Sequence, residues 1–314
     1  MSGPWSFHLH VGAWIAVAVV ATAVVAASRR WPGRSTSGPD ARSSEPGHPR
    51  RWALVGGLAA LAAAWTWPVA DLAAHWSLTA LLVQRLLLTL AAAPLLLLAT
   101  PAEVVAHVTR PAAVDAVWAR VTRPVTAGVI FAVVSIGSLA PAAVAAQTSS
   151  AIWRATFDVA MLGAGFVLWG PILRHLAGAS RPAAVGLAVY AFVQSVVPTF
   201  PAVIYVLARH PFYPAFVHAH GVFGLAALTD QQVAGVVAKV ATLPVLWSVA
   251  WVALDHVHRA DRTGHDPDLL QWLDVERAFL RAERRQAAGR RPRHRSGIPR
   301  LPAPHTANPG DLPD

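Results

Sequence analysis

The sequence predicts an all-α protein, a polytopic membrane helix bundle of seven transmembrane helices with the N-terminus outside and the C-terminus inside. Three observations support this prediction. The 314 residues are 55% hydrophobic and 13% charged. Their mean hydropathy of +0.45 is higher than a water-soluble domain needs to form one core. The hydrophobic residues gather in windows of about 20, the length of a helix that crosses a ~30 Å hydrocarbon layer. The basic residues lie between alternate windows.

Seven windows combine this length with few charges. They cover residues 9–27, 52–70, 78–99, 125–146, 156–173, 183–207 and 230–254. The first window has no Lys or Arg before it, and its first basic residues, Arg29 and Arg30, follow it. This order predicts a retained helix and not a cleavable signal peptide.

The distribution of basic residues predicts the orientation. Of the 26 Lys and Arg residues, 22 lie in the segments 28–51, 100–124, 174–182 and 255–314, which are all cytoplasmic if the N-terminus is outside. The opposite connections hold only Arg154 and Arg209. These predicted cytoplasmic basic residues account for the net charge of +10. We therefore predict no nucleic-acid partner.

Three regions are expected along the chain. Residues 1–254 form the seven-helix transmembrane domain, 255–288 a cytoplasmic amphipathic helix at the interface, and 289–314 a disordered basic tail. Asp266 and Pro267 resemble the start of that helix. Its arginines are expected to meet anionic lipid headgroups.

The composition and motifs exclude several functional classes. The chain has no cysteine, which excludes disulfides, Cys-ligated zinc, iron–sulfur clusters and thiol-based copper handling. It also lacks a phosphate-binding Gly-Lys-Ser/Thr loop, a His-Glu-x-x-His motif and a Gly-x-Ser-x-Gly motif. We therefore predict that the protein is not an enzyme.

Ionisable and amide side chains in the outer half of the bundle form the first candidate site. A charge inside a span costs roughly 2.5–3.5 kcal/mol, so it usually faces a partner or a cavity. The predicted intramembrane polar cluster comprises Gln84, Arg85, Asp158, Asp230, Gln231, Gln232 and Lys239. Either Arg85 or Lys239 forms an ion pair with Asp158 or Asp230 that only fixes helix packing, or the cluster lines a small polar cavity that opens outward.

Histidines form the second candidate site. Two His-x-His pairs, His8 with His10 and His218 with His220, lie in predicted outer segments. This spacing can bring two imidazoles to one metal ion, and copper is the candidate cofactor. The alternative is that these histidines are solvated or lie at the membrane surface.

Several stretches resemble the CtaG-type cytochrome c oxidase assembly factors, a family of seven-helix bacterial membrane proteins linked to copper supply for haem–copper oxidases. The stretches read WPVADLA at 67–73, TALLVQRLLL at 79–88 with Ala93-Pro94, GFVLWGP at 165–171, FYPA at 212–215 with Gly224-Leu225, and TDQQVAG at 229–235. The resemblance covers about residues 52–254, and its most specific element is Asp-Gln-Gln-x-x-Gly.

The chain also departs from this family at positions that the resemblance associates with metal ligands. Family members typically carry His-Met-x-Gln-His where this chain has LLVQR at 81–85, and a His where it has Leu139. Family histidines correspond to Arg154 and Asp158, and a family Met-Trp pair to Ala238 and Lys239. The family's copper role therefore does not transfer to these positions.

The resemblance implies a diverged oxidase assembly factor that acts by binding haem–copper oxidase subunits in a bacterial plasma membrane. The alternative function is a channel or transporter for small molecules or ions, with an outward-facing polar pocket.

Overall fold

The computed structural model describes residues 5–30, 48–101, 104, 107, 110–173, 184–197, 199–217 and 222–263. The chain divides into two compact units, Met1–Arg259 and Ala260–Asp314, and the second is described only as far as Thr263. Every regular element in the described residues is helical, which confirms the predicted all-α class.

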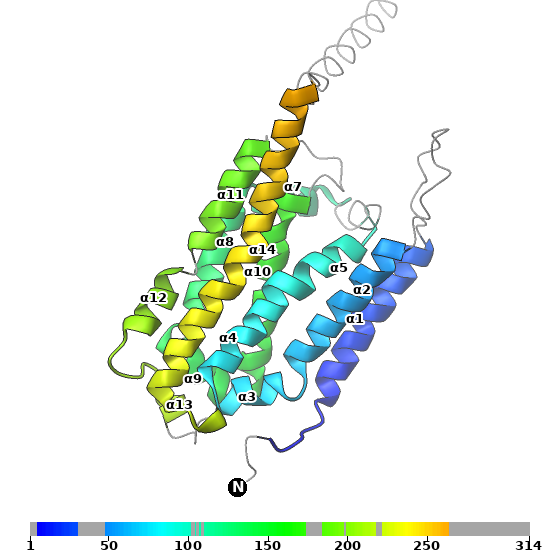
Figure 1. Ribbon diagram of the computed structural model, residues 1–314. Helices are drawn as coiled ribbons and strands as arrows, with labels where there is room; N and C mark the ends of the chain where they lie inside the picture. The colour runs from blue at the N-terminus through cyan, green and yellow to red at the C-terminus, as the bar shows by residue number, and fades with distance from the viewer. Residues whose placement is uncertain are drawn as a thin grey trace, which may run out of the picture. The chain divides into compact units, whose positions relative to one another are not determined.

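The helices of Figure 1 keep the following bounds. They are α1 (Val11–Arg30), α2 (His48–Trp65), α3 (Val69–His75), α4 (Leu78–Leu86), η2 (Leu87–Ala92), α5 (Ala93–Ala99), α7 (Ala112–Val121), α8 (Pro124–Gly137), α9 (Pro141–Ser149), α10 (Ala151–Leu173), α11 (Ala184–Val196), α12 (Thr199–Leu207), α13 (Pro214–Val217), η4 (Val222–Gly224) and α14 (Ala227–Thr263).

The protein is a multi-pass membrane protein by the length and composition of its helices. Five described segments are long and apolar enough to cross a membrane, namely Arg50–His75, Leu78–Ala99, Ala151–Leu173, Gly186–Leu207 and Ala227–Asp255. The bent pair α7 and α8 raises this number to six if it is one span, and Val11–Ala27 in α1 is apolar but shorter. The predicted number of seven is therefore not confirmed, and the orientation remains a prediction.

The predicted continuous helix at 125–146 is wrong. Helix α8 ends at Gly137 and α9 begins at Pro141. Proline disfavours helical geometry in the residue before it and has no N–H to continue the hydrogen-bond ladder. Ala140 accordingly has ψ of 141°. The result is a break inside the bundle at Ser138–Ala140, and the candidate site described below is built around it.

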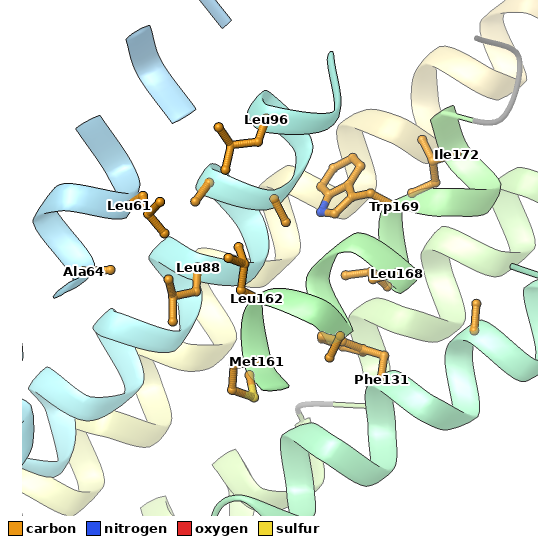
Figure 2. Packing of buried hydrophobic residues seen from close by; sticks show 14 of the residues in the cluster. Leu61, Ala64, Leu88, Leu96, Phe131, Met161, Leu162, Leu168, Trp169 and Ile172 are labelled. Atoms are coloured by element: carbon orange, nitrogen blue, oxygen red, sulfur yellow. The ribbon is translucent and has the colours of Figure 1, made fainter. Parts of the chain in front are cut away.

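A large apolar core holds the long helices together. Helix α10 packs against α8, α5 and η2, and α2 packs against α5 and η2. Figure 2 shows Leu61 of α2, Leu88 of η2 and Leu162 and Leu168 of α10 within this core. In Figure 1, α1 lies beside α2 at one edge of the bundle.

The segment 78–99 is helical throughout, but its middle widens into the π-helix η2 (Leu87–Ala92). A π-turn shifts the backbone hydrogen bonds and leaves carbonyls open to side chains. Trp169 Nε1 donates to the carbonyl of Thr89 at 2.9 Å, and Thr89 Oγ1 donates to the carbonyl of Arg85 at 2.7 Å. The Trp169 indole and the Thr89 hydroxyl thus supply donors to backbone carbonyls in and next to the irregular turn. This turn begins two residues after Arg85.

The predicted C-terminal regions lie mostly outside the described residues. Helix α14 continues through the expected boundary at 254 to Thr263. The expected helix start at Asp266, the rest of the amphipathic helix to 288, and the basic tail at 289–314 are all outside the described residues.

Candidate buried polar site

Arg85 is the most deeply buried charge among the described residues. Its residue exposure is 4%, and it lies on the last turn of α4. Its Nη2 donates to the carbonyl of Ser138 at 3.0 Å and to Oε1 of Gln147 at 2.8 Å. A guanidinium has five donors in a fixed fork, so it can join two acceptors that come from different helices. Arg85 thereby connects α4 to the break between α8 and α9.

The break explains why these acceptors are available. The last carbonyls of a helix have no partner inside it, and a cation at that end interacts favourably with the helix dipole. Ser138 is the C-cap residue of α8, directly after its last residue, Gly137. Gln147 Nε2 donates to the same Ser138 carbonyl at 3.0 Å and to the carbonyl of Ala143 at 2.9 Å. Arg85 and Gln147 therefore cap the end of α8 together.

Two tyrosines also contact the break between α8 and α9. Tyr213 donates its hydroxyl to the carbonyl of Leu139 at 2.6 Å, and the hydroxyls of Tyr205 and Tyr213 are hydrogen-bonded to each other. Both rings are buried. Burial and the hydrogen bond with Tyr205 raise the pKa of Tyr213, so its phenol stays neutral in the folded chain. We refer to Arg85, Ser138, Leu139, Gln147, Tyr205 and Tyr213 as the break network.

The predicted ion pair of Arg85 is not formed. Among the described residues, no carboxylate oxygen lies within 4.0 Å of its guanidinium. Asp158 instead accepts a hydrogen bond from Gln84 Nε2 at 3.3 Å, and the same amide donates to the carbonyl of Ala64 at 2.9 Å. The charge of Asp158 interacts at longer range with both Arg85 and Arg154. The carboxylate is thus shared between two arginines and pairs directly with neither.

Asp230 has a different role, as a cap supplied by another helix. It is 7% exposed at the start of α14. Its carboxylate accepts from Ser77 Oγ at 2.7 Å and from the backbone N–H groups of Leu78 at 2.6 Å and Thr79 at 3.4 Å. Thr79 Oγ1 donates to the Asp230 carbonyl at 2.9 Å. The first N–H groups of a helix lack partners and favour a negative charge, so Asp230 fastens α14 to the N-terminus of α4.

Gln231 and Gln232 make contacts of their own, separate from those of Arg85. Gln231 accepts from the backbone N–H of Phe212 at 2.7 Å, which holds the segment before α13. Gln232 donates to the carbonyl of Ala208 at 3.4 Å. Lys239 is half-buried in α14. Gln84, Arg85, Asp230, Gln231 and Gln232 thus take part in at least three separate connections between helices, and the predicted common pocket stays a prediction.

The N-terminal histidines meet an aspartate from α3. His10 Nε2 lies 2.9 Å from Asp71 Oδ1 in a hydrogen bond. His8 Nδ1 lies 3.4 Å from Asp71 Oδ2 without hydrogen-bond geometry. In the described part of the chain, no group of three or more His, Cys, Asp or Glu side chains is arranged to hold a metal ion. His218 and His220 lie outside the described residues.

Two cavities lie near these groups. The first, of about 60 Å³, is between α4, η2, α8, α10, α12 and α14, and its lining includes Arg85, Ser135, Met161, Tyr205 and Thr242. The second, of about 310 Å³, lies where α3, α4 and α14 meet, and its lining includes Ser77, Thr79, Val222, Leu225 and Asp230. Both walls are mostly apolar side chains.

Sequence reasoning missed the partners of Arg85. Gln147 lies beyond the predicted fourth window and has no unusual neighbours, so nothing singled it out. Tyr205 and Tyr213 are two of only three tyrosines in the chain, and buried tyrosines usually seek a hydrogen-bond partner. The Ala140-Pro141 pair in an otherwise apolar window was the signal for a helix break with unpaired carbonyls.

A family described as the cytochrome c oxidase caa3 assembly factor (Caa3_CtaG) matches residues 21–260. No curated protein and no solved structure matches the chain. The matched range includes the break network and Asp230, but not His8 or His10.

Proposed function

Because the chain belongs to the cytochrome c oxidase caa3 assembly factor family, we propose that it binds an oxidase subunit in the plasma membrane of a bacterium while the enzyme is assembled. The observation that carries this proposal is the match over residues 21–260. That range runs from within α1 to within α14 and therefore takes in the apolar core and the break network.

We assign this role to binding and not to catalysis. The contacts of the buried polar groups support this choice. Arg85, Gln147 and Tyr213 bind backbone carbonyls at the end of α8, and Asp230 binds backbone N–H groups at the start of α4. These side chains position helices, and a helix bundle held in one arrangement is suited to present a fixed face to a partner in the membrane. No observation in the described residues favours a channel over this role.

Copper is the cargo that the resemblance associates with such a role. The described residues do not fit a copper ligand set, because His8 and His10 converge on a single carboxylate, Asp71, and no third imidazole or thiolate joins them. We therefore place any copper handling at the second His-x-His pair, His218 and His220, which lies outside the described residues, and not in the bundle. Copper analysis of the purified protein and of a His218→Ala/His220→Ala variant tests this placement: stoichiometric copper that the variant loses supports it, and copper retained by the variant contradicts it.

Deletion of the gene in its own host tests the assembly role. The expected result is loss of assembled caa3-type oxidase, measured by the haem a absorbance of membranes and by the amount of each oxidase subunit. The wild-type chain should restore both signals. A terminal oxidase of another type in the same membranes is the control, and it should be unaffected. Unchanged haem a absorbance in the deletion strain would contradict the role.

The orientation proposed from the basic residues is testable because the chain has no cysteine. A single cysteine placed at Pro214 should react in intact cells with a membrane-impermeant maleimide, whereas a cysteine at Arg42 should react only after the cells are opened. The reverse pattern would contradict the N-out, C-in arrangement and every assignment of an exterior face.

A further inference from the structure

We propose that α7 (Ala112–Val121) is an interfacial helix that binds the anionic headgroups of the lipid bilayer, and is not part of a membrane span. This contact goes beyond the oxidase-binding role proposed above, because its partner is the lipid surface and not a protein.

The direction of α7 follows from the sequence at its C-terminal end. Pro124 has no N–H and disfavours helical geometry in the residue before it, and Arg123 accordingly has ψ of 136°. The helical segments Ala113–Val121 and Pro124–Gly137 therefore meet at 79°. A helix at this angle to a transmembrane helix runs close to the plane of the membrane.

The bend between α7 and α8 lies near the end of a span. Thr122, at the bend, is fully buried, and a Cβ added at Gly170 of α10 would lie 3.0 Å from Thr122 Cγ2. Leu173, where the apolar segment Ala151–Leu173 ends, follows Gly170 by three residues, or about 4.5 Å of helix. The bend is therefore about one helical turn from the end of α10, at the depth of the membrane surface.

The chain can cross the membrane here without α7. Helices α8 and α9, of 14 and 9 residues, both pack against the 23-residue helix α10. At ~1.5 Å per residue, the two together supply about 34 Å of helix, which is enough for a hydrocarbon layer of ~30 Å. Helix α7 is thus free to lie along the surface.

One side of α7 is apolar and is not covered by the bundle. Val114, Val117, Trp118 and Val121 follow each other at helical intervals and lie within about 100° of one another around the helix. Val114 is 42% exposed and Val117 63% exposed. At the depth of the membrane surface, such a face can enter the boundary between headgroups and acyl chains.

The charges around this face are mostly positive. Arg110, Arg120 and Arg123 are exposed before, within and after α7, whereas Asp115 is the only carboxylate of the helix. In the described part of the chain, none of the three guanidinium groups lies within 4.0 Å of a carboxylate oxygen. A guanidinium can donate two hydrogen bonds to a phosphate. The arginines therefore fit anionic headgroups, and the apolar face beside them favours a lipid surface over a soluble anion.

Nitroxide accessibility of the full-length chain in nanodiscs tests the placement of α7. Because the chain has no cysteine, one label can be attached at Val117→Cys and, as the matched control on the opposite side, at Ala119→Cys. In nanodiscs of equal parts phosphatidylglycerol and phosphatidylcholine, the label at 117 should collide mainly with oxygen, which concentrates in hydrocarbon. The label at 119 should collide mainly with a water-soluble nickel chelate. Equal nickel accessibility at both positions would place α7 in water and overturn the proposal. A label at 117 that is shielded from both reagents would place α7 against protein and also overturn it.

Removal of either charge tests the headgroup contact. In nanodiscs of phosphatidylcholine alone, the nickel accessibility of the label at 117 should rise about twofold or more, because each arginine is attracted to an anionic surface. Arg120→Gln/Arg123→Gln should have the same effect in the mixed nanodiscs. Arg209→Gln removes an exposed arginine far from α7 in the sequence and should leave this accessibility unchanged. A label at 117 that is equally protected in all of these samples would show that α7 does not recognise headgroup charge, and would overturn the proposal.

Discussion

Asp230 should be one of the side chains on which the stability of the bundle depends most. Its carboxylate accepts two short hydrogen bonds, from Ser77 Oγ at 2.7 Å and Leu78 N–H at 2.6 Å, and Leu78 is only 1% exposed. A hydrogen bond to a charged group contributes about 1.5–3 kcal/mol, so Asp230→Ala should lower the free energy of unfolding by about 3–6 kcal/mol. Asp230→Asn keeps one acceptor oxygen and should lose roughly half as much.

Equilibrium unfolding in mixed micelles, followed by the fluorescence of the 13 tryptophans, measures this difference. Gln232→Ala is the matched control, since Gln232 lies two residues further along α14 and makes one long hydrogen bond of 3.4 Å to the Ala208 carbonyl. Its expected loss is below about 1 kcal/mol. If the Asp230→Ala and Gln232→Ala variants lose the same amount, Asp230 is not the cap that its contacts indicate.

Three further predictions concern other connections in the bundle. Gly165→Val should lower the unfolding free energy by about 1–3 kcal/mol in the same assay, because a Cβ at Gly165 would lie 2.8 Å from Ala93 Cβ; a stable variant would contradict the close approach. Since burial raises the pKa of Tyr213, the unfolded phenol ionises first as the pH rises past about 10, and stability falls there. Tyr213→Phe should therefore show a shallower decline in unfolding free energy between pH 9 and 11, and an equally steep decline would refute this assignment. His10→Ala removes the hydrogen bond to Asp71 and should speed amide hydrogen exchange at residues 5–10 without changing it in α4; unchanged exchange would show that the pair does not hold the N-terminal segment.

Hydropathy was sufficient to predict where most helices lie. The window at 78–99 coincides with the described segment Leu78–Ala99, because about 20 apolar residues can satisfy their backbone in a membrane only as a helix. The window at 125–146 failed for a local reason. A hydropathy average does not register that Pro141 removes one hydrogen-bond donor and turns Ala140 out of helical geometry.

The contacts of the buried charged side chains were harder to predict, because the sign of a charge does not show which group it will bind. Arg85 was expected to pair with a carboxylate, yet it binds the Ser138 carbonyl and Gln147, since the break supplies unpaired acceptors that also need a donor. Asp230 was placed in the same pocket, yet it caps α4 through groups about 150 residues away in the chain. Both contacts were missed for the same reason. Unpaired backbone groups at a helix end can bind a charged side chain in place of an oppositely charged side chain, and the sequence does not show which helix end lies near which charge.

The proposed role requires this chain to bind an oxidase subunit during assembly. This binding can be measured by crosslinking in intact membranes, followed by purification of the tagged chain and mass spectrometry of its partners. A caa3-type oxidase subunit should be recovered with the chain from cells that are actively assembling the enzyme. Recovery of intact chain without any oxidase subunit from those cells would contradict it.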